Sequence, residues 1–296
     1  MPFMVDDEHQ GMMATLSSLL LPIALSLAAV QAPKIDLSEK ALTALAAKYV
    51  AGYEKEFAFL IADEHYTQAR INASGRTVQT RVLRSELFLT YLPADGEWIA
   101  VRDVMEVDGV PVTQREDLRA FLSQKDQLHG LTSRLVARNA QYNIGSVTRN
   151  FNEPTLPLLL LEEKRISPVK FDRKRVERDG AATLATLAFE ERGSGTLVSE
   201  RQGPVPAKGE FVLDVSTGAI TRTLFLLKRP GVDVRLETTY VKDDKLDLWL
   251  PSVFTERYVS GAFTIGSRSV IRDRETIECE ARYANYRRFE VTARIK

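Results

Sequence analysis

Residues 210–240 read EFVLDVSTGAITRTLFLLKRPGVDVRLETTY, and this stretch decides the fold class. Two turn sequences, Ser216-Thr217-Gly218 and Pro230-Gly231, divide it into three runs of β-type residues. The last run alternates, and one of its faces carries Val232, Val234, Leu236, Thr238 and Tyr240. A period of two is that of a strand with one buried face, and short turns join antiparallel neighbours. The stretch therefore predicts an antiparallel meander.

The same pattern continues on both sides of this stretch. Turn sequences separate further β-type runs from about Val169 to the end of the chain, including KLDLWLP and SVFTERYV, and runs over 62–70 and 77–92 precede them. The chain ends in FEVTARIK, whose alternation over residues 289–295 predicts the final strand. We therefore expect a large curved antiparallel sheet with one apolar face.

Helical periodicity appears in two places. Over residues 37–57, extending to Leu60 and Ile61, apolar residues recur at helical spacing, and Asp36 with Glu39 resembles a capping box in which Asp36 is the cap. A helical insert at about 113–161 ends in LPLLLL, which we expect to form one or two buried helical turns. The predicted fold is α+β: a half-barrel-like antiparallel sheet with an N-terminal amphipathic helix and this insert, in one domain over residues 33–296.

The N-terminal segment has the pattern of a targeting signal. Residues 13–30 read MATLSSLLLPIALSLAAV, an uncharged run that ends in small residues. We interpret residues 1–32 as a secretory signal peptide that is cleaved after Ala28 or Ala32, which predicts a periplasmic or secreted protein. An uncleaved membrane anchor is the alternative, although Pro22 and three serines make a poor spanning helix. The third possibility is a cytoplasmic protein.

The composition narrows the functional classes. The chain has 40 basic and 40 acidic residues, which argues against a dedicated nucleic-acid binder. Cys279 is the only cysteine, so neither an internal disulfide nor a cysteine-based zinc site is available. His9, His65 and His129 show no metal-ligand spacing, and the motifs HExxH and GxSxG are absent. The sequence predicts no metal, no cofactor and no catalytic residue.

Two groups of residues are candidates for a ligand site. Trp98 and Trp249 lie in predicted strands, where they line either an apolar cavity between helix and sheet or an ordinary core. Tyr286, Arg287 and Arg288 stand close to Tyr283, just before the expected last strand. Guanidinium groups beside tyrosines can clamp a carboxylate or a phosphate, and the alternative is a solvated strand end.

Several segments resemble a group of uncharacterised secreted bacterial proteins. They include EFVLDVSTGAITRTLF, VRLETTYVKDDKLDLWLPSVFTERY and ARYANYRRFEV, and the match covers most of residues 40–296. More remotely, the leading helix, the meander and the NYRRF ending resemble the lipoprotein-carrier superfamily of LolA and LolB type. This resemblance implies a half-barrel whose concave face binds acyl chains. The size of the chain and its helical insert depart from that pattern.

The favoured hypothesis is a non-enzymatic, exported cell-envelope protein that binds an apolar or lipid-like ligand between the helix and the curved sheet. The second is a structural or protein-interaction module that meets an envelope protein and fills its sheet with its own side chains. The third is a hydrolase that uses His65 or His129. An open apolar cavity would favour the first hypothesis, and a filled core would favour the second.

Overall fold

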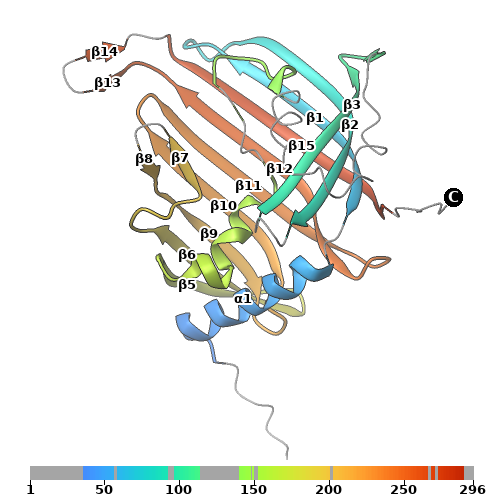
Figure 1. The fold of residues 1–296 in the computed structure, drawn as a ribbon, viewed down its shortest axis with the longest axis vertical. Coiled ribbons are helices and arrows are strands. Elements are labelled where there is room, and N and C mark those ends of the chain that lie inside the picture. The colour runs from blue at the N-terminus through green and yellow to red at the C-terminus, as the bar shows by residue number, and fades with distance from the viewer. Residues whose placement is uncertain are drawn as a thin grey trace, which may run out of the picture. The chain divides into compact units, whose positions relative to one another are not determined.

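The computed structural model describes residues 36–56, 59–92, 97–113, 140–147, 149, 153–200, 203–265, 268–270 and 273–289. The predicted leader at 1–32 and residues 114–139 of the predicted insert lie outside the described residues. In the described part, eleven antiparallel strands form one sheet, which Figure 1 shows to be strongly twisted and curved. A helix, α1 (Glu39–Glu56), packs on one face, which we call the inner face.

The sheet has the strand order β4-β3-β2-β1-β15-β12-β11-β10-β9-β6-β5. The two end strands, β4 and β5, do not pair, so the sheet is open and the predicted half-barrel-like α+β fold is confirmed. Two short ribbons, β7–β8 and β13–β14, stand apart from it. The bounds are β1 (Leu60–Ile71), β2 (Thr77–Leu92), β3 (Glu97–Val107), β4 (Val110–Pro111), β5 (Val169–Asp179), β6 (Ala182–Glu191), β7 (Val198–Glu200), β8 (Gly203–Val205), β9 (Ala207–Asp214), β10 (Ile220–Arg229), β11 (Val232–Asp243), β12 (Leu248–Ser260), β13 (Phe263–Ile265), β14 (Arg268–Val270) and β15 (Glu275–Arg288).

The meander predicted from residues 210–240 is confirmed as β9, β10 and β11. At the turn between β9 and β10, the Asp214 carboxylate accepts the main-chain N–H groups of Ser216 at 2.7 Å and Thr217 at 3.1 Å. Gly218 follows with a φ of 80°. A Cβ atom there would lie 2.7 Å from the carbonyl oxygen of Leu45 in α1. The turn therefore needs glycine both for its conformation and because the helix approaches so closely.

The predicted amphipathic helix is present, but both of its ends differ from the prediction. It begins at Glu39, so Ser38 is the N-cap, and the Ser38 hydroxyl accepts the N–H of Ala41 at 3.3 Å. Asp36 is not the cap, because its carboxylate accepts the Ser38 N–H at 2.8 Å in a turn before the helix. At the other end, Leu60 and Ile61 start β1 rather than continuing the helical pattern. The buried face of α1 consists of Leu42, Ala46, Val50 and Tyr53.

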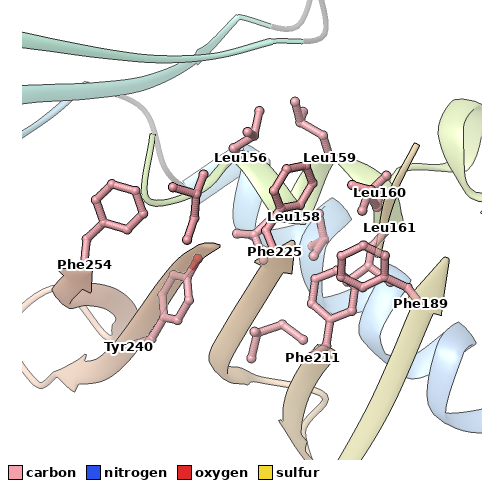
Figure 2. Packing of buried hydrophobic residues seen from close by; sticks show 14 of the residues in the cluster. Leu156, Leu158, Leu159, Leu160, Leu161, Phe189, Phe211, Phe225, Tyr240 and Phe254 are labelled. Carbon is pink, nitrogen blue, oxygen red and sulfur yellow. The ribbon is translucent and has the colours of Figure 1, made fainter. Parts of the chain in front are cut away.

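The end of the predicted insert forms the centre of the core. Residues Leu156–Leu161 form a 3-10 helix, η2, in which all six residues are buried, and the four-residue helix α4 (Glu163–Ile166) follows. The predicted buried helical turn is thus confirmed. We call Leu156–Leu161 the leucine plug. Figure 2 shows the plug over aromatic rings that project from five strands of the inner face: Phe189, Phe211, Phe225, Tyr240 and Phe254.

The expected last strand over 289–295 lies, except for Phe289, outside the described residues. β15 runs from Glu275 to Arg288 and already contains Tyr283, Tyr286, Arg287 and Arg288, which we expected ahead of the last strand. The pairing of β15 with β1 shifts between Ile61 and Asp63, and Asn285 has a φ of 53°. This bulge turns the end of the strand without ending it. Residues 290–296 lie outside the described residues.

Candidate functional site

A pocket of about 390 Å³ lies beside α1, at the end of the sheet where β12 begins. The helix supplies one wall, because residues three or four apart share one face of a helix. The turn between β9 and β10 and the first residues of β12 supply the other wall. The lining residues are Leu45, Lys48, Tyr49, Gly52, Tyr53 and Glu56 from α1, Ser216 and Thr217 from the turn, and Asp247, Leu248 and Trp249. The structure thus places the candidate Trp249 in a pocket between helix and sheet.

Aromatic rings form the apolar part of this pocket, which we call the Trp249 pocket. Tyr49 and Tyr53 stack with ring centroids 5.7 Å apart and an interplanar angle of 26°. Burial raises the pKa of both hydroxyls above the usual value for tyrosine, so both stay neutral. The charged lining groups, Lys48 and Glu56 of α1 and Asp247 before β12, are all exposed. Neutral aromatic surface with charged groups near the rim suits an apolar ligand that carries a polar end.

Gly52 lines the helix side of the pocket and has no side chain to fill it. A Cβ atom added at Gly52 would meet no other atom within 4 Å. Glycine in the interior of a helix costs about 1 kcal/mol relative to alanine. At Gly52 the helix accepts this cost, and the missing side chain leaves open space in the pocket. The site is therefore suited to a pocket-filling substitution.

The leucine plug fills the part of the inner face next to this pocket. Thr238 Oγ1 and Tyr240 Oη both donate hydrogen bonds of 2.8 Å to the carbonyl oxygen of Pro154, which precedes the plug. Phe189 packs against Phe211 and Phe225 with ring centroids 5.0 and 6.3 Å apart. Where the plug covers these rings, the protein's own side chains occupy the space that an acyl chain would take in an open half-barrel.

A buried polar network lies on the inner face of the strands at the centre of the sheet. Arg149, which is 2% exposed, donates to Gln68 Oε1 at 2.6 Å, to Cys279 Sγ at 2.7 Å and to the Tyr66 hydroxyl at 3.1 Å. Tyr66 in turn donates to Glu256 at 2.8 Å, and Tyr258 donates to the same carboxylate. The guanidinium of Arg149 thus balances the charge of a carboxylate that is itself buried.

A second ion pair adjoins this network. Arg102 Nε donates to both carboxylate oxygens of Glu64, at 2.9 and 2.7 Å, and its guanidinium lies 4.5 Å from the centroid of the Tyr66 ring. Sequence reasoning missed both buried carboxylates. The signal was present, because Glu64 and Glu256 occupy apolar-face positions in the alternation of β1 and β12.

The opposite, outer face of the sheet carries a shallow groove of about 690 Å³ across β2, β1, β15, β12 and β11. Charged side chains of the groove pair with each other or with neighbouring residues: Arg257 contacts Glu278 at 3.2 Å and Arg235 contacts Glu237 at 2.5 Å. Exposed pairs of this kind contribute little and point to no ligand.

The arginines of the NYRR segment bind other parts of the protein. Arg287 forms ion pairs with Asp63, at 2.9 Å, and with Glu86. Arg288 donates to the main-chain carbonyl oxygen of Glu56, the last residue of α1, at 2.8 Å. Tyr286 donates to the carbonyl oxygen of Pro251 at 2.7 Å. These contacts join β15 to α1 and to its neighbouring strands.

The other candidates are placed as follows. Trp98 pairs with Tyr91 across β3 and β2, and its side chain lies outside the described part of the structure. His65 is exposed on β1, and His9 and His129 lie outside the described residues. Within the described ranges, no group of three or more His, Cys, Asp or Glu side chains could hold a metal ion. Among the helices described here, none is long and apolar enough to cross a membrane.

No family model matches the chain, and no curated protein matches it. Two solved structures are similar to it over most of their length. One is the crystal structure of a "putative outer membrane lipoprotein-sorting protein domain" from Vibrio parahaemolyticus, with 10% identity over 82% of this chain and 91% of that chain and a TM-score of 0.34. The other is a DUF1329 family protein from Desulfovibrio piger, with 8% identity over 85% and 93% and a TM-score of 0.36. The remote likeness predicted from the sequence is thus found, at TM-scores too low to bear on function.

Proposed function

We propose that this protein is a non-enzymatic, exported cell-envelope protein that binds an apolar or lipid-like ligand in the Trp249 pocket. The observation that supports this most directly is the pocket itself, with its stacked tyrosines and Trp249 between α1 and the start of β12. Its volume of about 390 Å³ falls within the range of about 300–1,000 Å³ that is usual for small-molecule sites.

Burial of apolar surface would supply the affinity. Each methylene group that moves from water into the pocket contributes about 0.8 kcal/mol. The leucine plug limits the ligand, because the inner face beyond the pocket is filled. The ligand is therefore a single chain or ring system with its polar end near Lys48 and Glu56, rather than a molecule with several acyl chains.

The proposed location follows from the sequence. The leader at residues 1–32, with cleavage after Ala28 or Ala32, would deliver the protein to the periplasm or the exterior. There it would meet free fatty acids, lipids or an envelope protein partner. The zero net charge gives no reason to expect a nucleic-acid partner.

A second candidate function is a structural or protein-interaction module of the envelope. The leucine plug favours it, because a sheet filled by its own side chains needs no ligand for stability. The two candidates differ in one measurable respect, which is whether the folded protein takes up an apolar molecule.

The test uses protein purified from the periplasm of an expression host and a dansyl-labelled fatty acid as the probe. In a Trp98→Phe background, Trp249 is the only tryptophan, so energy transfer to the dansyl group reports binding near it. We expect saturable transfer. Trp249→Ala should lower the affinity about tenfold, or by about 1.4 kcal/mol, because it removes apolar surface that the ligand would bury; dansyl emission measures this.

A matched pair of variants locates the site. Gly52→Leu should fill the pocket and abolish probe binding, whereas Gly52→Ala adds one methyl group and should bind nearly as well. Both should keep or raise the unfolding temperature, because both improve helix propensity. Probe binding that survives Gly52→Leu would move the site elsewhere. A stable protein that takes up no probe would favour the interaction module.

A further inference from the structure

Two carboxyl groups meet where α1 packs against the leucine plug. Glu54 lies in the last turn of α1, and Glu162 directly follows the plug. The Glu54 carboxyl hydrogen-bonds the Glu162 carboxylate. The Glu162 side chain is only 4% exposed, and Oε1 of Glu54 is buried without a hydrogen-bond partner. Two carboxyl groups in such a place share a hydrogen bond only when one of them carries a proton.

Several of the described elements carry charged or titratable groups near this contact. From β2, the Tyr91 hydroxyl donates to Glu162 at 3.0 Å. From α4, Lys164 and Arg165 contact the same carboxylate at 3.4 and 3.2 Å. Lys164 and, to a lesser extent, Lys55 of α1 also favour the ionised form of Glu54. From β15, Arg288 donates to the main-chain carbonyl oxygen of Glu56 in the last turn of α1. Lys164 therefore acts on both carboxyl groups, but burial and the charge of Glu162 outweigh both lysines, so Glu54 is the member that takes up the proton.

We propose that Glu54 and Glu162 form a pH-sensitive latch that fastens the last turn of α1 to the leucine plug when the pair holds one proton and releases it when the pair holds none. The consequence for the ligand rests on the function proposed above. Tyr53 and Glu56, which flank Glu54 in the sequence of α1, line the Trp249 pocket. A fastened helix keeps the pocket wall in place, and a released one opens it.

The direction of the pH effect follows from the proton balance. Burial first, and then the Glu162 charge and hydrogen bond, raise the pKa of Glu54 from 4.5 to about 7. Between pH 4.5 and about 7, Glu54 keeps its proton in the folded state but has lost it in the unfolded state. Proton binding therefore stabilises the folded state at low pH, and this stabilisation is lost as the pH rises through about 7. The charge of the Glu54 carboxyl therefore changes near neutral pH.

The test reads the latch without any ligand, by hydrogen–deuterium exchange of the full chain. Protection factors, which correct for intrinsic exchange, are measured for amides 50–56. In the wild type we expect protection to fall about tenfold between about pH 6 and pH 8. Glu54→Gln keeps a neutral hydrogen-bond donor to Glu162 at every pH, so its protection should stay high and flat. Glu39→Gln, in the exposed first turn of the same helix, is the matched control and should follow the wild type.

Each outcome decides the matter. A flat wild-type profile, or a Glu54→Gln variant with the wild-type profile, overturns the latch. The wild-type profile needs no substitution, so the test survives a variant that fails to fold. Dansyl fatty acid titrations over the same pH range form a separate arm. If the probe never binds but the exchange profile is as expected, the proposed function fails and the latch stands. If the probe binds and the exchange profile is flat, the reverse holds.

Discussion

The Tyr240 hydroxyl on β11 donates a 2.8 Å hydrogen bond to the carbonyl oxygen of Pro154, which lies 86 residues away in sequence. Thr238, two residues earlier on the same face of the strand, donates to the same oxygen at 2.8 Å. All three groups are buried. Because a buried carbonyl without a partner costs free energy, this pair of bonds fixes where the leucine plug enters the core.

Removal of both donors should cost more than the two single losses together. Tyr240→Phe and Thr238→Val each leave Pro154 with one donor, and each should lower the free energy of unfolding by about 1 kcal/mol. The double variant leaves the carbonyl unsatisfied and should lose about 3 kcal/mol or more. Urea unfolding of the four proteins gives the coupling energy. Thr239→Val, exposed on the opposite face, is the control and should change stability by less than about 0.5 kcal/mol. Strict additivity would show that the carbonyl finds another donor.

The plug should be among the most sensitive positions of the chain. Leu158 is 1% exposed and packs into the aromatic cluster, so Leu158→Ala should lower the free energy of unfolding by about 2–5 kcal/mol, as urea denaturation would show. The new space is apolar, so this variant should also take up more of the dansyl fatty acid than the wild type.

Leu224→Ala is the matched control for the plug variant. Leu224 projects from β10 on the outer face and is only half-buried, so the same change should cost about 1 kcal/mol or less. Equal losses at the two positions would contradict the assignment of the plug as the centre of the core.

The sequence predicted the sheet because strand periodicity is a local property. Turn chemistry and alternation placed β9, β10 and β11, and the apolar run placed the plug. The extent of β15 was not predicted, because only its pairing with β1 and the bulge at Asn285 carry the strand on to Arg288. The LWLP part of KLDLWLP and the run SVFTERYV form a single strand, β12, because a register shift accommodates Pro251.

The candidate site was predictable only in part. Trp249 was singled out because tryptophans are few, and it does line a pocket. The partners that make that pocket come from α1 and from a turn, and no sequence spacing connects them. Arg149 was invisible for the same reason, because its contacts with Gln68 and Cys279 span 81 and 130 residues. Contacts of such long range follow from the assembled sheet and from no local pattern.

Cys279 should be unreactive in the folded protein. It is 5% exposed, and burial first and Glu256 second raise the pKa of its thiol to about 12, so almost none of the reactive thiolate exists at neutral pH. Iodoacetamide at about pH 8 should leave the native protein unmodified and label it fully in urea, as intact mass would show. A Ser74→Cys/Cys279→Ala variant, with its thiol at an exposed turn, should react at once. Native labelling of Cys279 at a similar rate would mean that the inner face opens readily.

Substitution of Arg288 distinguishes a structural role of this residue from a role in ligand binding. Its hydrogen bond to the Glu56 carbonyl satisfies one of the free acceptors at the end of α1 and places a cation at the negative end of the helix. Arg288→Ala should therefore lower the free energy of unfolding by about 1 kcal/mol, as urea denaturation would show, and reduce amide protection in the last turn of α1.

The control for this change lies on the same strand. Arg282 makes a solvated pair with Glu280 at 2.8 Å, so Arg282→Ala should cost less than about 0.5 kcal/mol. A structural Arg288 predicts that probe affinity in Arg288→Ala falls only as far as the helix loosens, and that Gly52→Ala, which strengthens α1, restores it. Lost affinity with unchanged amide protection would instead assign Arg288 to direct contact with the ligand's polar end.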